Sequence, residues 1–158
     1  VEWDKLIKQS TSNEIIPNIE LGKKYYDNHL YTEAIKHFIL ALKETEDVIT
    51  IISVKQVIAE IYLQLEKFSA SENHAREALH LSKKENLHNE IASSYLLLGH
   101  VKEKQGSYLE AIQYLNTSIQ KFNTYKNPIG VARCNLQIGS IYEDLNQYNK
   151  AESYFRKA

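Results

Sequence analysis

The sequence predicts an all-α fold, a solenoid of about four antiparallel helix pairs. The first observation is a spacing that occurs four times: a small residue is followed nine positions later by an aromatic residue, and three positions after that by another small residue. A fixed period of this length is typical of stacked repeats. The second observation is the scarcity of glycine (five) and proline (two) among 158 residues, which disfavours turn-rich β architectures.

The repeats are aligned on the first small residue, which we call the marker. The markers, at intervals of 37, 40 and 40 residues, are Gly22, Ala59, Gly99 and Gly139. The aromatic residues are Tyr31, Phe68, Tyr108 and Tyr148, and the second small residues are Ala34, Ser71, Ala111 and Ala151. Helices joined by a few residues pack at close approach, so we expect Gly99 to face Ala111 and Gly139 to face Ala151. Three residues after the marker stands a tyrosine, except at Lys102.

The elements are expected in the following order. Residues 1–13 form the end of a preceding segment or a short capping helix. The repeat array covers 14–158, with repeats at about 14–46, 50–84, 90–124 and 128–158. Residues 50–65 contain β-branched residues that also suit a strand, but the repeat register favours a helix. Helix boundaries are signalled by Pro17 in a first turn, by Gly106 as a residue suited to positive φ, and by Asn127 as an N-cap before Pro128.

Two segments, LGKKYYDNHLYTEAIKHFILAL and GSIYEDLNQYNKAESYFRKA, resemble the tetratricopeptide repeat. The resemblance covers roughly residues 15 to 158 and implies a right-handed superhelix of helix pairs. The period of about 40 residues, longer than the usual 34, resembles two groups. One is the peptide-responsive regulators of Gram-positive bacteria, which are response-regulator phosphatases and pheromone-dependent transcription factors, and the other is eukaryotic motor or polarity adaptors. The segment EIYLQLEKFSASENHAREALHLSKK is similar to the bacterial group.

Charge and cysteine content exclude several classes of partner. Nineteen basic and twenty acidic residues give a net charge of −1, which offers no electrostatic basis for binding nucleic acid or a membrane surface. The one cysteine, Cys134, lies in an apolar helical pattern and is expected in the core. These features are compatible with a cytoplasmic protein. The repeat resemblance implies that the partner is a protein or a short peptide.

No enzymatic role is expected. The sequence has no glycine-rich phosphate loop, no paired cysteines and no zinc-binding H-E-x-x-H motif, so neither a cofactor nor a metal is predicted. His74 and His80 lie on different faces of one helix, and the other histidines are scattered. The resemblance places the catalytic residue of the phosphatases in an N-terminal bundle that this sequence lacks.

Candidate ligand-binding residues are those that the resemblance places on the concave face, at fixed distances from each marker. Polar and apolar residues alternate along them, a pattern suited to an extended peptide whose backbone is held by polar side chains. The candidates are Lys23, Tyr26, Gln56, Glu60, Leu63, Ser93, Leu96, His100, Glu103, Arg133, Leu136, Ser140 and Glu143.

The leading functional hypothesis is the sensor part of a bacterial cytoplasmic regulator that binds a short peptide and changes its curvature. One alternative is a constitutive interaction scaffold. Another is the regulatory half of a phosphatase or DNA-binding regulator whose active domain is absent from these residues. We also expect a possible homodimer through the last helix, where Tyr154 and Phe155 lack a following repeat.

Overall fold

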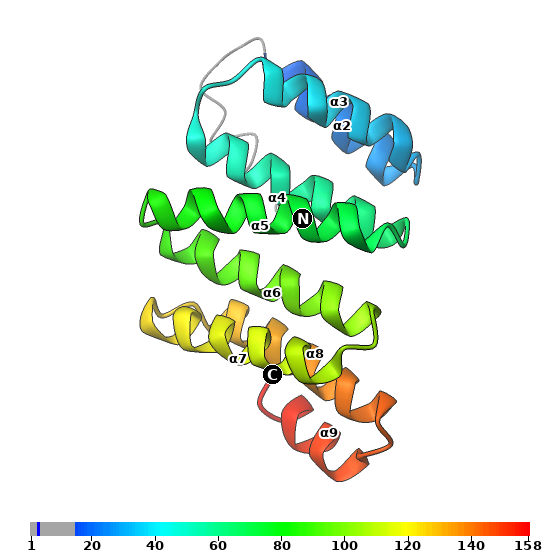
Figure 1. Ribbon diagram of the computed structural model, residues 1–158, viewed down its shortest axis with the longest axis vertical. Coiled ribbons are helices and arrows are strands. Elements are labelled where there is room, and N and C mark those ends of the chain that lie inside the picture. The colour runs from blue at the N-terminus through cyan, green and yellow to red at the C-terminus, as the bar shows by residue number, and fades with distance from the viewer. Residues whose placement is uncertain (1–2, 4–14) are drawn as a thin grey trace. The chain divides into compact units, whose positions relative to one another are not determined.

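The computed structural model describes residue 3 and residues 15–158, in which all regular secondary structure is α-helical. The prediction for residues 1–13, apart from Trp3, lies outside the described residues. The segment with strand-like composition is helical, as the repeat register predicted. The helices (Figure 1) are α2 (Ile15–Asp27), α3 (Tyr31–Lys43), α4 (Val48–Gln64), α5 (Phe68–Lys84), α6 (His88–Lys104), α7 (Tyr108–Thr124), α8 (Pro128–Asp144) and α9 (Tyr148–Phe155).

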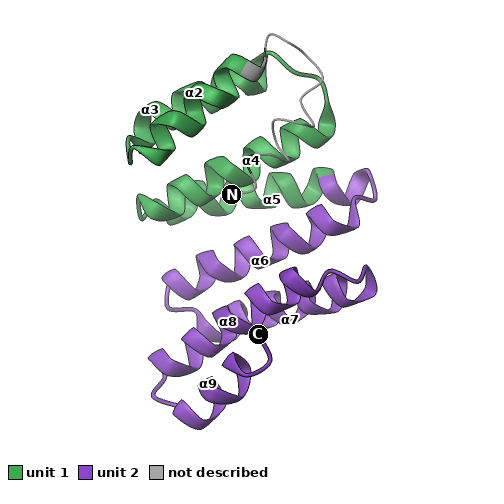
Figure 2. Ribbon diagram, turned by 180° about the vertical axis from the view of Figure 1, so that it is seen from behind, with its two compact units in different colours: residues 1–81 green, residues 82–158 purple. Residues whose placement is uncertain are grey.

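The chain forms two compact units, residues 1–81 and residues 82–158 (Figure 2). Unit 1 contains α2, α3, α4 and most of α5. Unit 2 contains the last residues of α5 and the helices α6 to α9. Each unit therefore holds two consecutive helix pairs, and each has its own apolar cluster.

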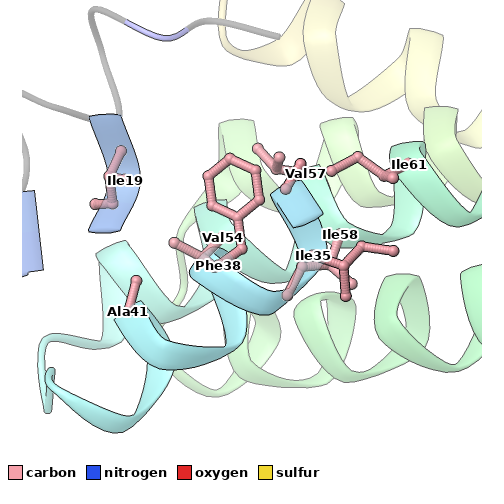
Figure 3. Packing of buried hydrophobic residues seen from close by; sticks show 9 residues of the cluster. Ile19, Ile35, Phe38, Ala41, Val54, Val57, Ile58 and Ile61 are labelled. Carbon is pink, nitrogen blue, oxygen red and sulfur yellow. The ribbon is translucent and has the colours of Figure 1, made fainter. Parts of the chain in front are cut away.

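The core of unit 1 is built by α2, α3 and α4. Phe38 of α3 is fully buried and lies in one cluster with Val54, Ile58 and Ile61 of α4 (Figure 3). Contacts within the α4–α5 pair show that its helices are antiparallel. Lys55 Nζ lies 2.5 Å from Glu77 Oε2, and Ser71 Oγ donates to the Ala59 carbonyl at 2.7 Å. From the first contact to the second, residue numbers rise along α4 and fall along α5.

The core of unit 2 lies between α6, α7 and α8. Leu115 of α7, Ile138 of α8 and Cys134 of α8 are fully buried in one cluster, as expected for Cys134. The Cys134 thiol donates to Ser118 Oγ at 3.3 Å, and Ser118 Oγ donates to the Ala92 carbonyl at 2.7 Å. Both polar side chains are satisfied inside the core, which avoids the cost of burying an unpaired donor.

One turn geometry joins most of the helices. The turn between α7 and α8 has Lys126 at φ 54°, and the Asn127 and Lys126 amides donate to the carbonyls of Phe122 and Asn123 at 2.9 and 3.1 Å. This is the Schellman arrangement, which satisfies the last carbonyls of a helix. The same positive φ occurs at His29, Glu66, Asn86, Gly106 and Asn146.

This shared turn explains the period. Each helix from α4 to α8 has 17 residues and is joined to the next by a three-residue turn, so a helix pair repeats every 40 residues. The interval between the first two markers is 37 because α3 has 13 residues and the connection after it is one residue longer. The expectation for Gly106 is confirmed by its φ of 76°.

Three helix boundaries differ from the prediction. Helix α3 ends at Lys43 rather than at about residue 46, and α4 begins at Val48 rather than at residue 50. The physical reason is a cap: Asp47 accepts the Thr50 amide at 2.8 Å. Helix α6 begins at His88 rather than at about residue 90, because His88 and Asn89 belong to its first turn. The cap at Asn127 and the first-turn position of Pro128 are confirmed, since Asn127 Oδ1 accepts the Gly130 amide at 2.9 Å.

The predicted contact of the marker Gly99 is confirmed, and the structure adds a large side chain beside each marker glycine. A Cβ added to Gly99 would lie 2.8 Å from Leu115 Cγ and 3.3 Å from the Ala111 carbonyl oxygen, while one added to Gly139 would lie 2.4 Å from Phe155 Cε1. Gly99 therefore faces Ala111, as predicted, while the nearest atoms to both glycines belong to a large side chain of the second helix. The glycines make room mainly for these side chains.

Candidate binding faces

The predicted residues of unit 1 lie on α2 and α4. Lys23, Tyr26, Gln56 and Glu60 are half-buried, and Leu63 is buried. Burial raises the pKa of the Tyr26 phenol, and the nearby carboxylate of Glu60 acts in the same direction. Tyr26 of α2 also packs against the apolar cluster that contains Val57 and Ile61 of α4. We call the five predicted residues the α2–α4 face.

The predicted residues of unit 2 lie on α6 and α8. Two contacts show that these helices run parallel. Asn127 Nδ2, at the start of α8, donates to Asn89 Oδ1 of α6 at 3.5 Å, and further along both helices Gln137 Nε2 donates to Glu103 Oε2. Because residue numbers rise in the same direction along both helices, successive candidates on α6 lie beside successive candidates on α8. We call the following set the α6–α8 face: Ser93, Leu96, His100, Glu103, Arg133, Leu136, Ser140 and Glu143.

Exposure differs along the α6–α8 face. Leu96 and Glu103 are buried, Ser93, His100 and Ser140 are half-buried, and Arg133, Leu136 and Glu143 are exposed. Leu136 is an apolar side chain that remains 51% exposed between Arg133 and Ser140. The α8 side of this face therefore offers an apolar contact with hydrogen-bonding groups one turn away on either side.

Glu103 is the unusual carboxyl group of this face. Only 6% of the residue is exposed. Burial raises the pKa of Glu103 to about 7; Lys104 opposes this shift and Asp144 adds to it. Among the described residues, Glu103 and Glu90 are the buried carboxyl groups. Near neutral pH the protonated and ionised forms of Glu103 are both populated, so this side chain can donate or accept a hydrogen bond.

His100 is shifted in the opposite sense. Burial lowers the pKa of His100 to about 4, and the positive charges of Lys104 and Arg133 act in the same direction. The imidazole is therefore neutral at physiological pH and offers one donor and one acceptor nitrogen. The exposed guanidinium of Arg133 is a nearby cation that can meet a ligand carboxylate.

Sequence reasoning missed Gln137 and Trp3. Gln137 lies two residues before its marker, outside the positions taken as inward-facing, yet it reaches Glu103 across two helices. The available signal was the residue type, because a glutamine amide has both a donor and an acceptor. Trp3 lies in unit 1 with its ring 5.3 Å from that of Tyr26. No repeat periodicity extends to Trp3, so the pattern gave no signal for this contact.

The irregular position Lys102 is explained by ring packing. In the other three repeats the tyrosine after the marker stacks on a ring of the second helix, as Tyr142 does on Tyr154 at 5.5 Å. In the third repeat Lys102 Nζ instead lies 3.6 Å from Glu110 Oε2, and the ring of Tyr114 pairs with that of Tyr95 at 6.1 Å. The departure is thus accommodated on the side away from the α6–α8 face.

Two further properties concern the described residues. Among them, no group of three or more histidine, cysteine, aspartate or glutamate side chains is placed to hold a metal ion. None of the helices that the structure describes combines the length and the apolar character that crossing a membrane requires.

Comparison with known proteins gives a family match for part of the chain. Residues 90–158 match the tetratricopeptide repeat family. None of the curated protein sequences matches the chain.

Solved structures show the same fold at low sequence identity. The crystal structure of MamA is 22% identical with a TM-score of 0.64, and the match covers 98% of this chain and 81% of MamA. A Rap protein complexed with competence and sporulation factor is 20% identical with a TM-score of 0.79, over 89% of this chain and 40% of that one. The apo form of RapI is 19% identical with a TM-score of 0.79, over 94% and 56%. The chain therefore spans less than two thirds of either Rap structure.

Proposed function

We propose that this chain, whose residues 90–158 match the tetratricopeptide repeat family, is a protein-interaction module that binds a short peptide on the α6–α8 face. In this proposal the chain is the sensor part of a bacterial cytoplasmic regulator. The likeness of the fold to a Rap protein complexed with competence and sporulation factor supports this assignment.

The observation that carries the proposal is the exposed Leu136 beside hydrogen-bonding groups from two parallel helices. An extended peptide presents amide groups on alternate sides of its backbone, and these need donors and acceptors at regular intervals. Arg133 and Ser140 lie one turn from Leu136 on α8, and the Glu103–Gln137 pair bridges from α6. Leu136 then offers an apolar contact for one peptide side chain.

The experiment is a titration of the purified chain with a library of short labelled peptides, followed by fluorescence anisotropy. Saturable binding by a sequence-related subset is expected. Circular dichroism first shows that the protein is folded. If a folded protein binds no peptide saturably, the proposal is wrong.

The scaffold hypothesis and the sensor hypothesis predict different results in hydrogen exchange. A constitutive scaffold binds its partner without a change in conformation, so hydrogen exchange outside the binding face stays the same with and without peptide. A peptide sensor shifts an equilibrium between two states, which requires that the peptide bind the two states with different affinities.

The residues encoded upstream of this segment test the regulator hypothesis: a helix-turn-helix indicates a DNA-binding regulator, and a three-helix bundle indicates the phosphatase type.

A further inference from the structure

Trp3 lies in an aromatic slot of unit 1. Its ring is nearly parallel to that of Phe38, at 5.7 Å between centroids and 9° between planes. It meets the ring of Tyr26 edge-on, at 5.3 Å and 68°. Trp3 is half-buried and packs against the apolar cluster that α3 and α4 share. One indole ring therefore contacts both a candidate binding residue and the core.

The walls of this slot are held by contacts that do not involve Trp3. The ring of Phe38 is fixed against α2, since a Cβ added to Gly22 would lie 2.8 Å from Phe38 Cε1. The ring of Tyr26 packs edge-on against that of Tyr31 at 5.6 Å and 62°. Two aromatic surfaces positioned by α2 and α3 thus keep their orientation when the indole leaves, which is the condition for a preformed subsite.

We propose that Tyr26 and Phe38 form a binding subsite for an aromatic side chain of a peptide, and that Trp3 occupies this subsite when no such peptide is bound. Stacked and edge-on ring pairs are not specific to tryptophan, so a phenylalanine, tyrosine or tryptophan of a ligand can make the same two contacts. This subsite belongs to unit 1 and does not depend on peptide binding at the α6–α8 face.

An occupant from the same chain weakens the apparent affinity of a competing ligand. When only a fraction of molecules has the slot open, the apparent dissociation constant is the intrinsic constant divided by that fraction. Removing the indole opens the slot in every molecule. The proposal therefore predicts tighter binding of an aromatic peptide to a Trp3 variant than to the natural protein.

Trp3 also reports its own displacement, because the chain contains one tryptophan. The probes are a flexible glycine–serine hexapeptide with one central phenylalanine and the same peptide with alanine in place of the phenylalanine. Each peptide is used with an amino-terminal fluorophore to measure anisotropy and without the fluorophore to measure the Trp3 emission. The proteins are the natural chain, Trp3→Ala and Trp3→Phe. The matched control is Tyr148→Ala, which removes an exposed ring in unit 2.

The phenylalanine peptide is expected to shift the Trp3 emission of the natural chain to longer wavelength with a saturable dependence on concentration, while the alanine peptide does not. Trp3→Ala should bind the phenylalanine peptide at least about threefold more tightly than the natural chain and Tyr148→Ala do. Equal affinities, binding without a change in Trp3 emission, or no binding to any of the proteins overturn the proposal. If Trp3→Ala fails to fold, the emission of the natural chain decides: an unchanged emission with the phenylalanine peptide overturns the proposal.

Discussion

Gly99 of α6 lies against the buried side chain of Leu115 in α7, so that a Cβ on the glycine would be 2.8 Å from Leu115 Cγ. The same pairing of positions joins Gly22 to Phe38 and Gly139 to Phe155. In the second repeat the marker is an alanine, and the corresponding residue of the second helix is also an alanine, Ala75. A larger marker thus coincides with a smaller partner, which keeps the volume between the helices filled.

This relationship predicts strong coupling between two substitutions. Gly99→Ala alone should cost about 1–3 kcal/mol because the added methyl group overpacks the contact. Leu115→Ala alone should cost about 2–5 kcal/mol because it leaves a cavity. The double variant reproduces the alanine pair of the second repeat and should lose at least about 1 kcal/mol less than the sum. Urea unfolding of the four proteins measures this, and additive losses would disprove complementary packing.

The turns predict opposite effects of adding and removing glycine. Lys126 adopts φ 54°, a conformation that costs an ordinary residue about 1–2 kcal/mol. Lys126→Gly should stabilise the protein by about 0.5–1 kcal/mol, since the relief of strain exceeds the backbone entropy that glycine loses. Gly106→Ala should destabilise by about 1 kcal/mol, because φ 76° is unfavourable for alanine although the surrounding space is open. Lys126→Ala controls for the loss of the lysine side chain, and equal stabilities of Lys126→Ala and Lys126→Gly would contradict the prediction.

Glu103 and His100 predict opposing dependences of stability on pH. The pKa of Glu103 is raised from 4.5 to about 7 in the fold, so its stabilisation is present below pH 4.5 and is lost as pH rises through 7. The pKa of His100 is lowered from 6.5 to about 4, so its stabilisation is present above pH 6.5 and is lost as pH falls through 4. Each shift corresponds to about 3 kcal/mol, and the two partly cancel between pH 4.5 and 6.5.

Substituting each residue alone separates the contributions of Glu103 and His100 to the pH dependence of stability. The free energy of unfolding of Glu103→Gln should rise between pH 4 and pH 6.5, since His100 remains. That of His100→Gln should fall between pH 4.5 and pH 7, since Glu103 remains. Urea unfolding across this range measures both slopes. Parallel pH curves for the two variants and the natural protein would show that neither group is perturbed as described.

Self-association through α9 stays a prediction that the exposed rings support. Tyr148 is 62% exposed and Phe155 is 40% exposed, while Tyr154 stacks on Tyr142. Sedimentation equilibrium should give a molecular mass that rises with concentration for the natural chain. Tyr148→Glu should lower this association by placing a charge among the rings. A natural chain that stays monomeric at every accessible concentration excludes the dimer.

The helix pairs were predictable because their signals are local and repeated. The spacing of small and aromatic residues gave the order of the helices, and the cap at Asn127 with Pro128 followed from residue type. The shared turn was harder to predict from the sequence, because Glu66 and Lys126 are not residues that favour positive φ. Their conformation follows from the fixed helix length and close packing of the pairs, which only the assembled fold imposes.

The candidate faces were predictable in part. The family resemblance, applied at fixed distances from each marker, proposed His100, Glu103 and Arg133, and the structure places these residues on the neighbouring helices α6 and α8. Register could not show that Glu103 is buried, because burial depends on the adjacent helix α8. Nor could it predict the contact between Trp3 and Tyr26, which joins residues without a shared periodicity.

Peptide binding at the α6–α8 face is tested most directly by comparing affinities for one selected peptide. Fluorescence anisotropy should give a dissociation constant at least about tenfold weaker for Leu136→Ala and for Arg133→Ala than for the natural chain, a loss of about 1.4 kcal/mol each. Because both side chains are exposed, the thermal unfolding midpoints of the two variants should differ little from that of the natural chain. The control is Lys121→Ala, an exposed position of α7 outside the face. Equal dissociation constants for all four folded proteins would contradict binding at this face.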